Sequence, residues 1–243
     1  MRPGALLALA LVLASCGGAA RDEGGLHASA SASGQAMMVA GDRPYDVTRA
    51  QPADGRIDIE TTDGGNRWSH LQNKDVVKVT AEFTQGSDRF RVVIDKPMPR
   101  HPHGAYTTWS GVVYEAAQHG RTGIGTSELP RMQPEISAWG YAEVSLNGRV
   151  VAKGAPAHVM VTDAGEMRGV TLDVAGEDRS LVGVRDGYLV VHWPTIGALA
   201  MPEAEERNRE YLGWAVLLAL VLLFGWLAAN EPAVTVVRRA TTR

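Results

Sequence analysis

The amino-acid sequence predicts a mainly β protein, an antiparallel sandwich or barrel of about nine strands, followed by one C-terminal transmembrane helix. Three observations lead to this prediction. Runs of alternating polar and apolar residues recur through the middle of the chain, and turn-forming residues separate these runs. Near the C-terminus comes one long stretch without any charge.

The first strands are predicted from alternation with a period of two. Residues 56–61 (RIDIET), 77–83 (VKVTAEF) and 89–94 (RFRVVI) place apolar side chains at about every second position. Successive side chains of a strand point to opposite faces, so this pattern indicates one buried face and one face in water.

Turn residues mark two β-hairpins. Asn147-Gly148 and Asp186-Gly187 supply the positive φ angles that tight hairpin turns need. We expect the strands that flank these turns at 142–146, 149–152, 180–184 and 188–193, and further strands at 106–114, 156–162 and 168–174.

Residues 211–229 (YLGWAVLLALVLLFGWLAA) predict the transmembrane helix. About 19 helical residues cover roughly 29 Å, which is close to the thickness of the hydrocarbon core of a bilayer. Tyr211, Trp214 and Trp226 lie near its ends, where aromatic side chains favour the membrane interface. A buried core helix is a poorer explanation, because a domain of this size does not cover a helix on all sides.

The N-terminal residues predict an export signal. Arg2 is followed by a short apolar run at 5–12 and then by small residues, which is typical of a secretory signal peptide. Leu13-Ala14-Ser15-Cys16 resembles the lipobox of bacterial lipoproteins. The resemblance implies that Cys16 is lipidated and becomes the first mature residue. The alternative is an ordinary cleaved leader with a chance cysteine.

Together these features predict the organisation of the chain. The predicted parts are a signal peptide (1–15), the lipidated cysteine with a flexible linker (16–36), an extracytoplasmic β domain (37–200), a juxtamembrane helical stalk (201–210), a transmembrane helix (211–229) and a short cytoplasmic tail (230–243). The linker is inferred from its Gly, Ala and Ser content. Arginines in the tail favour its cytoplasmic location.

Composition excludes several classes of function. The formal net charge of −3 gives no basic footprint for nucleic acid. Cys16 is the only cysteine, so the chain can form neither an intramolecular disulfide nor a multi-cysteine metal site. No nucleophile elbow or zinc-protease motif occurs, and an enzyme is the less favoured interpretation.

A set of histidines and methionines is the strongest chemical signal in the β domain. Imidazole and thioether ligands together suit copper, and loops at one end of a sandwich could bring such residues together. The candidate metal ligands are Met98, His101, His103, His119, His158 and Met160. His158 and Met160 are two residues apart in a predicted strand and so share a face.

The sequence therefore predicts a lipoprotein of the bacterial inner membrane with its main domain on the periplasmic side. Membrane lipid is the expected partner of Cys16 and of residues 211–229. We expect a non-catalytic binding or accessory module, such as a subunit of an inner-membrane assembly with another membrane protein. The alternative is a periplasmic copper-binding protein that uses the His/Met loops.

Overall fold

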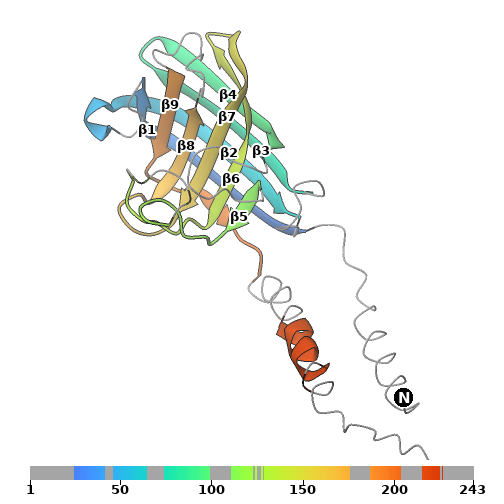
Figure 1. Ribbon diagram of the computed structural model, residues 1–243. Helices are drawn as coiled ribbons and strands as arrows, with labels where there is room; N and C mark the ends of the chain where they lie inside the picture. The colour runs from blue at the N-terminus through green and yellow to red at the C-terminus, as the bar shows by residue number, and fades with distance from the viewer. Residues whose placement is uncertain are drawn as a thin grey trace, which may run out of the picture. The chain divides into compact units, whose positions relative to one another are not determined.

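The computed structural model describes residues 25–41, 46–64, 74–98, 111–122, 124, 127, 129–175, 187–203, 215–224 and 226, and Figure 1 shows their arrangement. The elements are β1 (Leu26–Ala40), the short 3-10 helix η1 (Val47–Arg49), β2 (Gln51–Asp63), β3 (Val76–Gln85), β4 (Asp88–Pro97), β5 (Val112–Tyr114), β6 (Ile136–Leu146), β7 (Arg149–Thr162), β8 (Gly169–Ala175), β9 (Tyr188–Trp193) and β10 (Ala198–Ala200).

Eight of these strands close into an antiparallel barrel. Strands β1, β2, β3, β4, β6, β7, β8 and β9 pair in that order, and β9 pairs back with β1 at residues 37–40 (Figure 1). The short strands β5 and β10 extend the edges of β6 and β1, where each long strand changes partner. Of the two predicted architectures, sandwich and barrel, the protein adopts the barrel.

Strand β1 corrects the predicted domain boundary. Residues 26–36, expected to belong to a flexible linker, form most of this strand and pair with β2 along their whole length. Ala28, Ala30 and Ala32 point into the barrel and are at most 5% exposed, while the serines between them point outward. The alternation is present in the sequence, but it is between alanine and serine, so it gives little hydrophobic contrast.

Most other predicted strands are confirmed. The predicted segments 56–61, 77–83 and 89–94 lie inside β2, β3 and β4. Asn147 and Gly148 have φ values of 52° and 81° and form the predicted β6–β7 turn. The segments expected separately at 149–152 and 156–162 are one strand, β7, and the strand expected at 180–184 lies outside the described residues.

The barrel interior is filled by apolar side chains. These core residues come from every strand of the closed barrel and are at most 9% exposed, and Ile57, Ile94, Leu172 and Val191 are among the least exposed. The core combines small residues, such as the alanines of β1, with large ones, such as Phe83 and Phe90, whose stacked rings have centroids 5.2 Å apart. Close packing of this kind indicates a structural core.

The chain enters and leaves the barrel at the same end. Leu26, the first residue of β1, pairs with Asp63, the last of β2, and Ala200 at the end of β10 pairs with Ser29. We call this the exit end, and the opposite end, with the β3–β4 and β6–β7 turns, the hairpin end. The β7–β8 connection, at 163–168, also lies at the exit end.

Polar side chains fasten β5 to the exit end. The Tyr114 hydroxyl donates to the Leu26 carbonyl (3.0 Å) and lies 3.1 Å from the Thr61 hydroxyl. Both carboxylate oxygens of Asp75 accept backbone N–H groups, from Gly64 at 2.8 Å and from Val112 at 3.0 Å. Burial raises the pKa of Tyr114, so it stays a protonated donor.

The C-terminal segment is a separate unit that begins at Pro202. Residues 215–224 and 226 are helical and lie within the predicted transmembrane segment, and their large apolar side chains are exposed except for Leu220, which is half-buried. Among the described residues, no helix has both the length and the apolar character that crossing a membrane requires. The remaining residues of the predicted helix lie outside the described part.

Candidate functional site

The candidate site lies on the outer wall of the barrel, on β6 and β7. Ala157, Val159 and Val161 of β7 belong to the interior core, so His158 and Met160, which alternate with them, face outward. Trp139 takes the same orientation on β6, directly opposite His158. Outward-facing side chains normally contact water, yet these three are 7%, 3% and 2% exposed.

The segment from β5 to β6, residues 115–135, contributes the buried side chains of Gln118 and His119, and its described residues are 115–122, 124, 127 and 129–135. Two backbone hydrogen bonds, 2.9 and 3.0 Å long, join Gln118 and Met132 near the two ends of this segment. Gly120 N–H donates to the Leu129 carbonyl (3.0 Å) just beyond. These bonds fix the residues of the segment that lie against the barrel.

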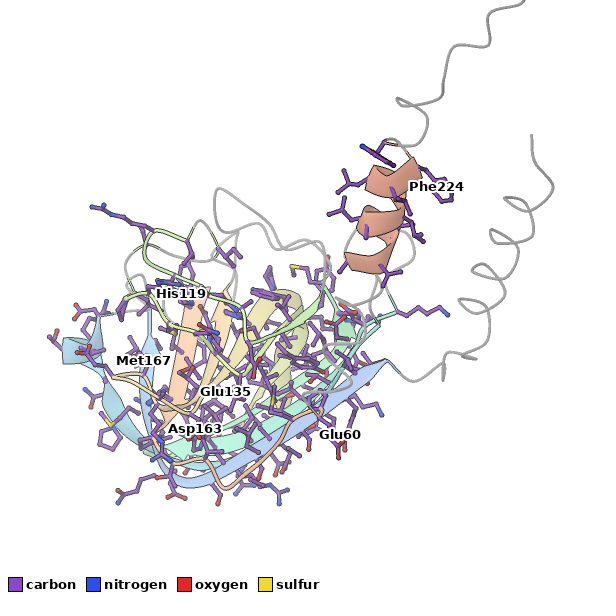
Figure 2. All side chains as sticks on the ribbon, turned by 90° about the horizontal axis from the view of Figure 1, so that it is seen from below. Glu60, His119, Glu135, Asp163, Met167 and Phe224 are labelled. Atoms are coloured by element: carbon purple, nitrogen blue, oxygen red, sulfur yellow. The ribbon has the colours of Figure 1, made fainter. Side chains whose placement is uncertain are left out.

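His119 is held in an uncommon backbone conformation and contacts β7. Its φ is 61°, in the left-handed region, which costs a non-glycine residue roughly 1 kcal/mol. Its N–H donates to the Ile124 carbonyl (2.7 Å), and its own carbonyl accepts from Thr122. The His119 ring, labelled in Figure 2, places Nε2 3.2 Å from Met160 Sδ.

His158 joins the same cluster through its ring. The indole of Trp139 stacks on it, with centroids 4.6 Å apart and planes 5° from parallel. The centroids of His158 and His119 are 6.2 Å apart. The cluster therefore combines two imidazoles, one thioether and one indole in a buried layer between the barrel wall and the covering segment.

Gln118 borders the cluster and is fully buried. Its Nε2 forms a hydrogen bond with Ser137 Oγ, and Ser137 pairs with Met160 across β6 and β7. Within the described part of the chain, Gln118 Oε1 has no hydrogen-bond partner. A buried polar atom in that state costs about 1–3 kcal/mol. Gln118 and its neighbour His119 thus both oppose folding locally.

A third imidazole, that of His192 on β9, lies farther along the outer wall beyond β8. Thr171 pairs with Met160 on one side and with His192 on the other. The Thr171 hydroxyl lies 2.9 Å from His192 Nδ1. Burial lowers the pKa of His192, partly opposed by a hydrogen bond to the Arg168 backbone, so the neutral ring is favoured.

The structure brings together three of the six predicted metal ligands: His119, His158 and Met160. Met98 is buried, and its N–H donates to the Trp139 carbonyl at 2.8 Å. His101 and His103 lie outside the described residues.

Neither Trp139 nor Gln118 was predicted as part of the site. The alternation of β6 does not reveal that the segment preceding it covers its outer face at Trp139. Gln118 carried no signal at all.

The cluster offers nitrogen and sulfur donor atoms. The described residues contain no group of three or more His, Cys, Asp or Glu side chains placed to hold a metal ion. Two imidazoles and a thioether remain, a donor set that suits soft monovalent ions better than Mg²⁺, Ca²⁺ or Zn²⁺.

Comparisons with known proteins place the chain in no described group. No family model matches the sequence, and neither a curated protein nor a solved structure is significantly similar to it.

Proposed function

We propose that the protein is a membrane-anchored binding or accessory module of the bacterial inner membrane, with the barrel on the periplasmic side. The observation that carries the proposal is the common exit end. The connection toward Cys16 leaves at Leu26, and the connection toward residues 211–229 leaves after Ala200, three residues along β1.

A shared exit end is what two anchors in one membrane require. Each connection between the barrel and its proposed anchor is about ten residues long, which reaches at most roughly 35 Å when extended. Exits at opposite ends would force one of these short connections along the outside of the barrel.

The C-terminal helix supports the second anchor. Eight of its large apolar residues are 45–64% exposed, and Leu220 is half-buried: the eight are Val216, Leu217, Leu218, Val221, Leu222, Leu223, Phe224 and Trp226. Apolar side chains around a whole helix are unfavourable in water and favourable in lipid or against another membrane helix.

Removing the anchors singly and together tests the proposal. Cys16→Ser should abolish fatty-acid labelling but leave the protein in carbonate-washed membranes, because residues 211–229 remain. Truncation after Glu203 should likewise leave it membrane-bound through Cys16. In the combined variant residues 1–16 are replaced by the cleavable leader of a secreted protein, because an uncleaved apolar leader would itself hold the chain in the membrane, and this variant should release a folded barrel.

Membrane retention of the combined variant, or unchanged fatty-acid labelling of Cys16→Ser, would refute the double anchor. The accessory role is tested separately by purification of the full chain from detergent-solubilised membranes. A stoichiometric membrane partner should accompany the full chain and be lost when a polyleucine helix replaces residues 211–229. A chain that purifies alone would contradict that role.

A further inference from the structure

We infer that His119, His158 and Met160 form a buried binding site for Cu(I) on the outer wall of the barrel. The inference adds a ligand to the proposed accessory module. It does not depend on how the chain is anchored, because every ligand lies in the barrel and its covering segment.

The spacing of His119 and Met160 suits one shared ion. Zinc, a metal ion of similar size, lies about 2.0 Å from imidazole nitrogen and about 2.3 Å from thiolate sulfur. With bonds of this length and angles of a right angle or more, one ion would hold its nitrogen and sulfur ligands about 3–4 Å apart. His119 Nε2 and Met160 Sδ are 3.2 Å apart.

His158 supplies the third side of the site. It lies two residues before Met160 on the same face of β7, and its ring centroid is 6.2 Å from that of His119. The stacked Trp139 fixes the plane of the His158 ring. A metal-binding imidazole gains affinity when its orientation is set by neighbours in this way.

The chemistry of the donors selects the ion. Thioether sulfur is a soft ligand that favours Cu(I), whereas Zn²⁺ and Cu²⁺ prefer sites with more ligands or with anionic ones. The three ligands are at most 7% exposed, so few waters could complete a larger coordination shell. Trp139 adds an electron-rich indole beside the site, which tolerates a cation.

The covering segment bears the cost of assembling the site. His119 occupies the left-handed region, and the adjacent Gln118 buries an amide oxygen that has no hydrogen-bond partner among the described residues. Local costs of this kind persist where the surrounding structure enforces them, and they concentrate at functional sites.

Anaerobic titration of the full chain in detergent tests the inference. Cu(I) is supplied as its bicinchoninate complex, and the protein should remove one equivalent. Met160→Leu keeps volume and apolar character but removes the sulfur, and should weaken Cu(I) binding at least about 10-fold. His119→Asn removes the imidazole but keeps a residue that tolerates positive φ, and should have a similar effect.

Matched controls separate the site from copper binding elsewhere. Met37→Leu and His27→Gln alter an exposed methionine and an exposed histidine of β1, and should leave the titration unchanged. X-ray absorption of the copper-loaded protein should show nitrogen and sulfur ligands, with the sulfur contribution lost in Met160→Leu.

Three results would overturn the inference. The first is a natively folded wild-type chain that removes no Cu(I). The second is unchanged binding by both Met160→Leu and His119→Asn. The third is copper binding that is lost in His101→Ala/His103→Ala but kept in Met160→Leu, which would assign the ion to the 99–110 connection. None of these results bears on the anchors, so this inference and the proposed function can fail separately.

Discussion

His192 lies on the outer wall, where partial burial makes the stability of the barrel depend on pH. His192 is half-buried between Thr171 and the backbone of Arg168, and burial lowers its pKa below the ordinary value of about 6.5. In the unfolded chain the ring takes up a proton as the pH falls through about 6.5. The folded chain binds that proton only at lower pH. Stability contributed by the neutral ring is therefore complete above pH 6.5 and is lost below it.

We accordingly expect the urea midpoint of the wild-type barrel to fall between pH 7.5 and pH 5.5, and to fall less in His192→Gln. Tryptophan fluorescence of the full chain in detergent measures the midpoint at each pH. His27→Gln, at an exposed position on β1, is the control, and its urea midpoint should fall with pH as much as that of the wild type. Equal pH dependence in His192→Gln and wild type would show that His192 does not contribute.

Among the elements, β1 differs most from its prediction, because residues 26–36 were expected to form a linker and instead form a strand. Ala32 is 2% exposed and points into the barrel, whereas Ser33 is exposed on the outer wall opposite Arg56. Ala32→Asp would bury a carboxylate in an apolar core and should lower the free energy of unfolding by at least about 3 kcal/mol. Ser33→Asp should change it by no more than about 0.5 kcal/mol.

Urea unfolding of the two variants measures this difference. Equal stabilities would mean that residues 26–36 are a linker outside the barrel, as their composition alone suggested. The two substitutions introduce the same side chain at adjacent positions, so net charge does not differ between the variants, and their compositions differ only by one alanine against one serine.

The contrast between β1 and β3 explains what sequence could predict here. Residues 77–83 alternate valine, alanine or phenylalanine with polar residues, and this contrast in hydrophobicity predicts the strand β3. Residues 28–33 alternate alanine with serine, and the small gain from burying a methyl group left the pattern indistinct. The Asn147-Gly148 turn was predicted because its positive φ angles restrict the residue type.

The candidate site was half-predictable for a related reason. His158 and Met160 share a strand face by periodicity, so their proximity followed from the sequence. The approach of His119 did not, because it depends on how residues 115–135 fold back over β6 and β7. Nothing local to His119 encodes that path, apart from the left-handed turn at His119 and Gly120.

For the molecule as a whole, the proposed double anchor requires the exit end of the barrel to face a membrane. The candidate copper site lies close to that end, since Met160 is two residues from the end of β7. Under the proposed double anchor, a partner in the same membrane would approach the site from the exit end.

The most direct test compares the two ends of the barrel. Ala164→Cys lies in the β7–β8 connection at the exit end, and Ser87→Cys lies in the β3–β4 turn at the hairpin end, and both positions are exposed. Strands of about ten tilted residues separate the ends by roughly 25 Å. Each variant is labelled with bimane and reconstituted with doxyl lipids, which quench only nearby fluorophores. The account predicts strong quenching at position 164 and little at position 87. Equal quenching at both positions, or stronger quenching at position 87, would contradict it.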